Sequence, residues 1–515
     1  MRKLSCASIA ACALTVGFLG AAPAEAQKSA DTLRIAINDP IDTLSPYDRP
    51  NEESAPFYNE IYRSILRRND FTKTYGEEMV KSWKRIDPVT IEIELRDDLT
   101  FHSGNKVTAD DAVYTINWAS DPKVPLPNKG GYLWVKNAEK TGPYTFRVIA
   151  KQQSAADLTT LAYKFFLLDS KVHQGMAQSA DYGRLSSSGT GPYRMVSLDR
   201  NKGVVLERWA GYKGTPKQGR APIKTIIGIP IPEAQTQVAQ LLTGGIDVMR
   251  NPPYDTVNEL AKNRDLGVTS VPSGTYLYIH LDSIGRAGVK ALSDVRVRKA
   301  IVMAVNRDEI AKNFIAGGKS AEIQDTVCMK FSTACPKTVS PYPYNPTEAR
   351  KLLVEAGYAD GLELPFSVHA PYKDAAEAVA GQLLKVGIKS SIQPMGISVY
   401  FKKRDDGELA MFMGVRPTGS YPEVLAVFDS FFIEKRDYWR DPVILAAWKA
   451  AEGEMDADKR AAIVKPALDR MNEEAYVLPI ASVPTVFVHR KNVKVERNLT
   501  SASDSNVEDF FWKYS

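Results

Sequence analysis

Residues 293–315, Ser-Asp-Val-Arg-Val-Arg-Lys-Ala-Ile-Val-Met-Ala-Val-Asn-Arg-Asp-Glu-Ile-Ala-Lys-Asn-Phe-Ile, predict two consecutive helices. In the first helix, apolar side chains recur at the i, i+3, i+4, i+7 and i+8 positions of one face. These residues are Val297, Ala300, Ile301, Ala304 and Val305. The opposite face carries Arg296, Arg298 and Lys299, and Ser293 or Asp294 can cap the first turn. We therefore expect a helix that packs on a core along one side.

The second helix is predicted to begin after Asn306, a residue type that favours the N-cap position. Glu309 stands where a capping box places an acidic side chain, and Ile310 and Phe314 form an apolar side. The pair Gly317–Gly318 is expected to end this helix. Helix formation and packing explain the residue pattern of 293–315, and no catalytic or binding role is needed.

The length and composition of the chain predict a globular protein with more than one domain. It has 515 residues, of which 44% are hydrophobic and 25% charged. Single cores rarely grow beyond about 250–300 residues, so we expect two or three domains. Strand-like and helix-like patterns alternate along the chain, beginning with Leu33, Ile35 and Ile37 and continuing with a helical stripe from Phe57 to Leu66. This alternation predicts an α/β fold with mixed sheets.

Residues 1–26 have the pattern of a cleaved secretory signal. Arg2 and Lys3 precede an Ala-rich apolar run over 7–22, and Ala24-Glu25-Ala26 fits the cleavage site. The run is too short for a stable membrane span, and we expect none later in the chain. A lipoprotein site at Cys12 is disfavoured because the apolar run continues past it. We therefore predict an exported mature chain that begins near Gln27.

Charge and cysteine content restrict the possible functions further. The formal net charge is +5 for the whole sequence and about +4 without residues 1–26, where Arg2, Lys3 and Glu25 are lost. This charge is too small to indicate binding to nucleic acid or to a membrane surface. Of the four cysteines, Cys6 and Cys12 lie in the predicted signal. Cys328 and Cys335 are predicted to form a small disulfide in an oxidising compartment, with two unpaired buried thiols as the alternative.

The sequence offers little support for an enzyme. The five histidines, at positions 102, 173, 280, 369 and 489, lack the spacing of a zinc site. His102 is expected to be an exposed or backbone-bonded turn residue. No nucleophile elbow, P-loop or dinucleotide fingerprint is present, and Asp110-Asp111 and Asp405-Asp406 are expected to be surface or capping groups. We expect no catalytic residues, no cofactor and no bound metal.

Four groups of motifs, taken together and in order, resemble the family 5 extracellular solute-binding proteins. They are Leu95–Gly104 with Thr108–Val113, Gly189–Tyr193, Asp294–Ile301 with Val305–Arg307, and Asn345–Pro346 with Ala349–Leu353 and Ala356–Tyr358. This family comprises the peptide, nickel and opine-type receptors of ABC importers. The motifs extend over nearly all of the predicted mature chain, and the predicted signal agrees with them independently.

The resemblance implies a periplasmic binding protein-like fold, with two lobes around a ligand cleft and an inserted extra domain. Lobe I would take 27–65, 186–275 and 483–515, the inserted domain II would take 66–185, and lobe III would take 276–482. Closure of the lobes on a solute would signal the loaded state to an inner-membrane permease and its ATPase subunits. The implied protein is a periplasmic monomer that performs no reaction.

The loop predicted over 415–423 departs from the pattern of the peptide-binding members of the family. Those members carry a tryptophan there and, just before the tyrosine, an aspartate that pairs with the peptide ammonium group. Here Ser420 precedes Tyr421, and Arg416 lies in the tryptophan's neighbourhood. A serine cannot neutralise an ammonium group as the aspartate does. An arginine, in contrast, matches a carboxylate or a phosphate through two parallel hydrogen bonds. We therefore predict a solute with an anionic group near this loop, such as an opine or another acidic conjugate. A surface salt bridge or an anchor for the loop is the alternative role of Arg416.

The other expected ligand contacts are Asp42 and Thr43 in a first-lobe loop and Tyr132 in the inserted domain, although packing or turn roles are alternatives for each. A receptor for nickel or a metal chelate is a less favoured reading, because the histidines do not cluster. Ordinary peptide transport also stays open. A periplasmic chaperone or a secreted hydrolase would belong to another class; the former should expose large apolar patches and the latter should show a nucleophile or metal constellation.

Overall fold

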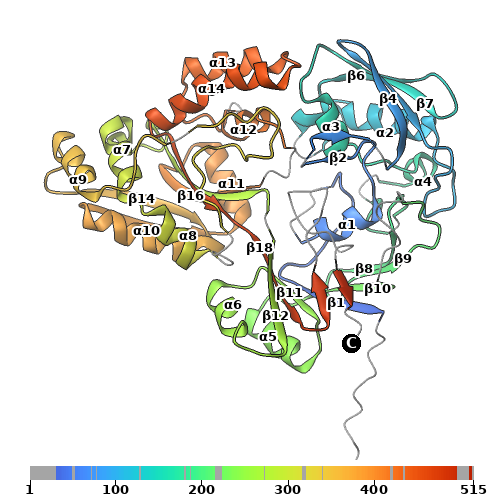
Figure 1. The fold of residues 1–515 in the computed structure, drawn as a ribbon, viewed down its shortest axis with the longest axis horizontal. Helices are drawn as coiled ribbons and strands as arrows, with labels where there is room; N and C mark the ends of the chain where they lie inside the picture. The colour runs from blue at the N-terminus through green and yellow to red at the C-terminus, as the bar shows by residue number, and fades with distance from the viewer. Residues whose placement is uncertain are drawn as a thin grey trace, which may run out of the picture.

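The computed structural model describes residues 31–48, 53–70, 72–76, 78–126, 129–178, 181–185, 187–214, 223–271, 273–315, 321–338, 340–417, 422–432, 435–495 and 510–512. Figure 1 shows its elements grouped around three main sheets. No helix within these ranges has the length and apolar composition that a bilayer crossing requires.

A seven-stranded mixed sheet brings together distant parts of the sequence. Its order is β12 (Leu266–Val271), β18 (Thr485–Arg490), β11 (Val248–Arg250), β1 (Thr32–Ile37), β10 (Thr225–Pro230), β9 (Gly203–Arg208) and β8 (Tyr193–Asp199). β1 runs parallel to β10 and β11, whereas β18 is antiparallel to β11 and β12. The helices α1 (Ala55–Ile61), α5 (Ala234–Thr243) and α6 (Tyr254–Leu260) belong to this region. The predicted first strand is confirmed.

A four-stranded antiparallel sheet forms a second region, built from residues between α1 and β8. Its order is β4 (Val80–Asp87), β5 (Thr90–Leu95), β7 (Thr145–Ala150) and β6 (Val135–Lys140). The helices α2 (Ala109–Ser120), α3 (Asp157–Tyr163) and α4 (Ser170–Gln174) and the short η1 (Lys129–Tyr132) accompany it, with the small pair β2 (Arg68–Asn69) and β3 (Thr74–Tyr75). Thr108 caps α2 in a reciprocal capping box with Asp111. One continuous hydrophobic core joins this region to the seven-stranded sheet, so we call the two together the first body.

The second body is residues 275–482, built on a five-stranded sheet. Its order is β15 (Ile388–Met395), β14 (Leu362–His369), β16 (Met411–Pro417), β13 (Thr275–Leu281) and β17 (Val477–Ser482). Alternate residues of β13 enter two separate cores: Leu277 and Ile279 face one, and Tyr276 and Tyr278 face the other. Helices therefore cover both faces of the sheet.

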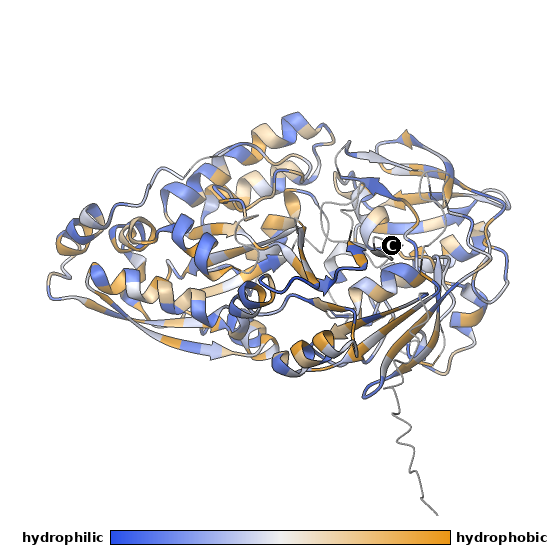
Figure 2. Ribbon diagram, turned by 60° about the horizontal axis from the view of Figure 1, so that its bottom comes forward, coloured by the Kyte–Doolittle hydropathy of each residue, from blue (hydrophilic) through white to orange (hydrophobic). Residues whose placement is uncertain are grey.

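The helices of the second body divide between these two cores. The first core includes α7 (Val295–Ala304), α8 (Arg307–Phe314), α9 (Pro346–Glu355) and α10 (Lys373–Lys385), and the second includes α11 (Ile397–Asp406), α12 (Leu425–Phe431), α13 (Pro442–Glu452) and α14 (Ala457–Glu473). Many of these helices carry hydrophobic and hydrophilic residues side by side in Figure 2, as surface helices on a core do. The remaining short elements are η3 (Lys290–Ser293), η5 (Ala370–Tyr372) and the strand pair β19 (Val493–Val495) and β20 (Phe510–Trp512).

The predicted helices over 293–315 are confirmed as α7 and α8, with two corrections. Arg298 does not lie on a solvent face: it is 3% exposed and donates to the carbonyls of Leu292 and Glu474. Asn306 caps α8 by accepting from the Glu309 N–H at 3.1 Å, but Glu309 does not complete a capping box. Gln382 of α10 takes that part, accepting from the Asn306 N–H and donating to the Glu309 carboxylate. The predicted stop at Gly317–Gly318 lies outside the described residues.

The chain crosses between the two bodies at adjacent places. It passes from β12 to β13 through residues 272–274 and from β17 to β18 through residues 483–484. The crossings lie side by side, because the Val483 N–H donates to the Thr275 carbonyl at 2.8 Å. Each body has its own hydrophobic core, so the crossings are the covalent links about which the bodies can rotate.

Candidate functional site

The two bodies face each other along a boundary that we call the junction. It is formed by α12 and the loops beside it in the second body, and by β2 and the surroundings of α3 in the first (Figure 1). Its apolar part is small, with Ala156 packed on Ala426. Backbone contacts add to it, since the Ala155 N–H donates to the Glu452 carbonyl at 3.1 Å and Gln153 Nε2 donates to the Gly453 carbonyl at 2.7 Å. Such a boundary can separate with far less loss of apolar contact than a core.

Arg68 makes a charged polar contact across the junction. Its side chain is buried, pairs with Asp70 in the first body, and reaches into the second body through Nη2. Nη2 donates to the Phe331 carbonyl at 3.3 Å and to Thr333 Oγ1 at 3.0 Å. Sequence patterns gave no sign of this contact, because the partners are far apart along the chain.

The acceptors of Arg68 belong to a loop closed by a disulfide. Cys328 and Cys335 are bonded, with their Cα atoms 5.9 Å apart. Thr333 in that loop is also tied to the segment that leads into α12, because its N–H donates to the Pro422 carbonyl and its carbonyl accepts from the Val424 N–H. The disulfide loop, the start of α12 and Arg68 therefore form one connected support at the junction.

Arg416 lies on β16, not in a loop as expected. β16 continues to Pro417, and Arg416 pairs in register with Tyr276 of β13. Its side chain is 6% exposed, and its Nε donates to Ser430 Oγ of α12 at 3.0 Å. Burial raises the pKa of Tyr276, and the nearby Arg416 guanidinium partly opposes that effect. Arg416 is therefore not a surface residue, as the salt-bridge alternative required, but a buried arginine that is hydrogen-bonded to α12.

Tyr132 lies in the first body at the junction. It is 5% exposed, with its ring centroid 5.3 Å from that of Phe165 and 6.1 Å from that of Tyr47. The Lys164 ammonium lies over its ring, 5.3 Å from the centroid. Burial raises the pKa of Tyr132, so the phenol stays protonated at neutral pH.

The structure brings Arg416 and Tyr132 to opposite sides of the junction, whereas the contacts of Asp42 and Thr43 are with other parts of the first body. Asp42 is exposed and pairs with Arg200 at the β8–β9 turn. Thr43 is buried, and its Oγ1 accepts from the Ser45 N–H, which stabilises a local turn. The remaining predicted contacts, Ser420 and Tyr421, lie outside the described residues.

A second buried ion pair stands behind α12. Arg460 of α14 donates from Nε and Nη2 to the two carboxylate oxygens of Glu423, at 3.0 and 3.1 Å. Both side chains are almost fully buried. A bidentate pair of this kind fixes the geometry of the segment that precedes α12.

The histidines have structural surroundings. His102 Nε2 lies 2.9 Å from the Gly191 carbonyl oxygen, and burial lowers the pKa of His102 to about 4. The backbone-bonded interpretation of this residue is therefore correct. His280 stacks between Phe412 and Trp439. Among the described residues, no group of three or more His, Cys, Asp and Glu side chains is placed to hold a metal ion.

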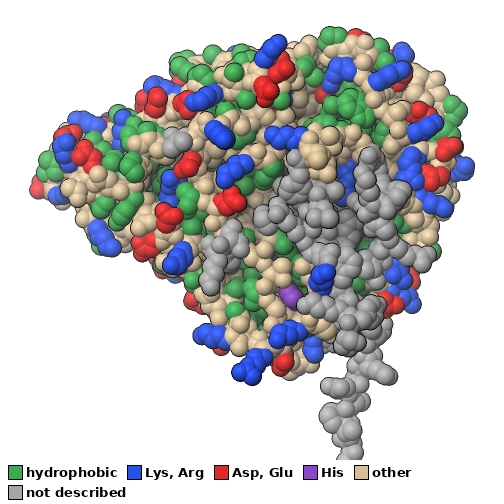
Figure 3. All heavy atoms as spheres, viewed as in Figure 1, with side chains coloured by type: hydrophobic (Ala, Val, Ile, Leu, Met, Phe, Trp, Pro, Cys, Tyr) green, Lys and Arg blue, Asp and Glu red, His purple; other side chains and the backbone are tan. Residues whose placement is uncertain are grey.

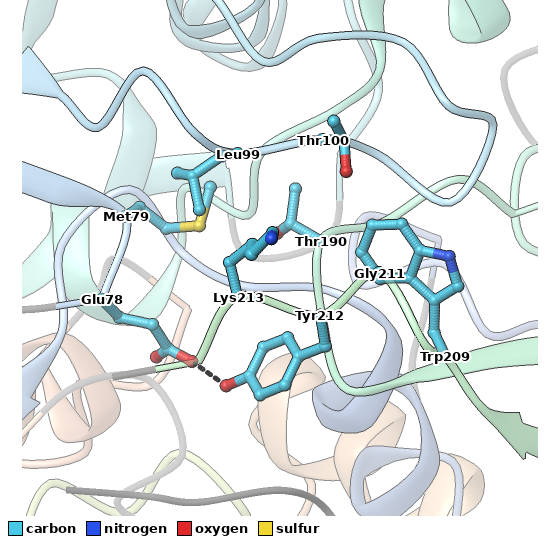
Figure 4. Close-up of a pocket in the computed structure, with 9 residues that line it drawn as sticks. All are labelled: Glu78, Met79, Leu99, Thr100, Thr190, Trp209, Gly211, Tyr212 and Lys213. Atoms are coloured by element: carbon cyan, nitrogen blue, oxygen red, sulfur yellow. Dashed lines mark hydrogen bonds between the residues drawn. The ribbon is translucent and has the colours of Figure 1, made fainter. Parts of the chain in front are cut away.

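A small cavity lies in the first body, apart from the contacts just described. Its volume of about 10 Å³ is enough for about one water molecule. Figure 4 shows its lining, in which Tyr212 donates to the Glu78 carboxylate at 3.0 Å. Arg63 and Arg67 also bind that carboxylate. The cavity is too small for a solute and contributes a buried charge network instead.

The visible surface gives no sign of a large single-charge face. Lys and Arg side chains are interspersed with Asp and Glu on the face shown in Figure 3. This distribution agrees with the small net charge of the sequence.

Comparisons with known proteins agree with this architecture. Residues 74–439 match the family described as bacterial extracellular solute-binding proteins, family 5 Middle. The glutathione-binding protein GsiB of Escherichia coli K12 is 26% identical over 390 residues, which are 74% of this chain and 73% of GsiB.

Two solved structures show the same fold. The periplasmic binding protein DppA of Helicobacter pylori, in complex with the peptide STSA, aligns over 94% of this chain and 98% of its own with a TM-score of 0.77 and 19% identity. The binding protein MoaA from A. tumefacien R10, in complex with mannopinic acid, aligns over 94% of this chain and 100% of its own with a TM-score of 0.77 and 19% identity.

Proposed function

Because this chain belongs to the family 5 bacterial extracellular solute-binding proteins, we propose that it captures a small solute between its two bodies and delivers it to the permease of an ABC importer. The observation that carries the proposal is the family match together with two bodies that have separate cores and meet at a largely polar junction. Rotation about the crossings at 272–274 and 483–484 would close the junction on the solute. A receptor of this kind needs no reaction.

The proposed cellular setting and domain division follow from the same family membership. The chain would be exported through cleavage of residues 1–26 and act in the periplasm as a monomer, with an inner-membrane permease and its ATPase subunits as partners. Lobe I would comprise 27–65, 186–275 and 483–515, domain II 66–185, and lobe III 276–482. The first body would then contain lobe I and domain II.

The proposed solute carries an acidic group, as an opine-like or acidic peptide-like compound does. Support comes from Arg416, whose guanidinium is buried beside α12 and has no carboxylate partner among the described residues. Glutathione and mannopinic acid, named for the relative and for one solved structure, are both acidic compounds. Ser420, Tyr421, Asp42, Thr43 and Tyr132 remain proposed contacts.

Isothermal titration calorimetry with Arg416→Ala tests the ligand class. We expect the wild type to bind glutathione or mannopinic acid more tightly than trialanine amide, and the variant to lose that preference. The exposed Arg296, which pairs with Asp294 on α7, offers Arg296→Ala as a control of equal charge change. Trialanine amide has no carboxylate. Nanomolar binding of it that Arg416→Ala leaves unchanged would overturn the acidic-solute proposal.

A further inference from the structure

Lys164 is a buried cation that the first body presents at the junction. It follows the last turn of α3, where its backbone N–H still donates to the Thr160 carbonyl at 2.8 Å. The residue is 9% exposed, yet its Nζ has no hydrogen bond or ion pair to any residue that the structure describes. A buried ammonium without a partner is costly, and such groups call for a specific explanation.

The surroundings of Lys164 hold its ammonium in one place. The Tyr132 ring lies on one side at 5.3 Å, which is a cation–π contact. Gly131 lies close on another side, because a Cβ there would stand 2.8 Å from Nζ and 2.4 Å from Cε. The absence of a side chain at Gly131 therefore makes room for the end of the lysine.

The second body contributes charge to the same place through α12. Burial lowers the pKa of Lys164 to about 8, and the Asp429 carboxylate opposes this effect. Lys164 thus stays mostly protonated at neutral pH. Lys164 and Asp429 form no ion pair among the residues that the structure describes. Its neighbour Ser430 accepts from Arg416, so cations from both bodies approach adjacent residues of α12.

We propose that Lys164 binds an anionic group, such as a carboxylate, of the captured solute, with Tyr132 forming the apolar surface beneath it. The inference rests on the proposed function and adds a contact from the first body to it. A solute that reaches Lys164 from one body and α12 from the other gains contacts only when the bodies are together, and so favours closure. It also gives the buried ammonium an ion-pair partner, which it does not have among the residues that the structure describes.

The test measures binding of glutathione and of glutathione diethyl ester, in which both carboxylates are masked, by isothermal titration calorimetry. Lys164→Met keeps most of the length of the side chain but removes its charge. Gly131→Ala keeps the charge but displaces the end of Lys164. The control is Lys171→Met, which removes an exposed lysine from α4 of the same region.

We expect Lys164→Met to weaken glutathione binding about 10- to 100-fold, towards the level that the wild type shows for the diethyl ester. Gly131→Ala should weaken it in the same direction, and Lys171→Met should change it less than about twofold. Asp429→Asn should tighten glutathione binding, because it removes a negative charge near the bound carboxylate.

Three results would overturn the inference. One is an equal loss of affinity for glutathione and its diethyl ester in Lys164→Met. Another is weaker glutathione binding in Asp429→Asn. Either result would mean that Lys164 and Asp429 attract each other across the junction and stabilise closure without contacting the solute. The third is a wild type that binds trialanine amide but no acidic probe, which would leave the proposed receptor function intact. Binding of no probe, with no small molecule released from natively purified protein, would instead count against the receptor function itself.

Discussion

Thr333→Val tests whether the junction contact of Arg68 stabilises the closed arrangement. The substitution keeps the shape of the side chain but removes the hydroxyl that accepts from Arg68 Nη2 at 3.0 Å. A hydrogen bond to a charged group contributes about 1.5–3 kcal/mol. Arg68 would retain Asp70 and the Phe331 carbonyl at 3.3 Å, so we expect a cost at the lower end, about 1.5 kcal/mol.

This cost falls only on the arrangement in which the two bodies touch. A closed state weakened by about 1.4 kcal/mol lowers the apparent affinity for every solute about tenfold, regardless of solute charge. Calorimetric titrations of glutathione into the wild type and Thr333→Val measure this loss of affinity. Thr333→Ser is the control, because serine retains the hydroxyl. Unchanged affinity in Thr333→Val, or an equal loss in Thr333→Ser, would refute the role assigned to this contact.

Three further predictions concern stability. Cys335→Ser should lower the free energy of unfolding by about 2 kcal/mol, because it opens the disulfide loop. Urea titrations measure this change, and a free energy of unfolding equal to that of the wild type would contradict it. Burial raises the pKa of Glu78, but the stronger effect of Arg63 and Arg67 lowers that pKa to about 2. The ion pairs therefore stabilise the folded protein fully above about pH 4.5, and this stabilisation is lost as the pH falls towards 2. Urea midpoints of Glu78→Gln should therefore depend less on pH between 4.5 and 2 than those of the wild type, and parallel curves would be inconsistent with the ion pairs. Arg298→Met should reduce the free energy of unfolding by about 3 kcal/mol without changing the order of affinities among solutes, whereas an altered order would place Arg298 in the binding site.

The helices over 293–315 could be predicted because their signals are local. Apolar spacing and the Asn306 cap act within one or two turns, and both survive in the folded protein. The buried state of Arg298 could not be predicted, because its acceptor Glu474 belongs to the distant end of α14. Gln382 replaced the expected partner in the capping box for the same reason.

The junction illustrates the same limit for the candidate site. Arg416 and Tyr132 were found from family motifs and lie at the junction, although the predicted loop proved to be the end of β16. Arg68 and Lys164 were missed because nothing beside them in the sequence distinguishes them from surface cations. Their significance arises from burial and from elements that approach only in the fold, such as Thr333 and α12. An unusually close glycine beside a lysine likewise becomes visible only in three dimensions.

Native mass spectrometry of the exported protein tests the central claim most directly. We predict a folded monomer that carries one small acidic solute and returns to the solute-free mass when the solute is removed. Adding glutathione or mannopinic acid to the solute-free protein should restore a complex of one solute per chain if either belongs to the right chemical class. A protein that carries no solute after native purification, and that takes up neither these acids nor trialanine amide, would contradict the claim.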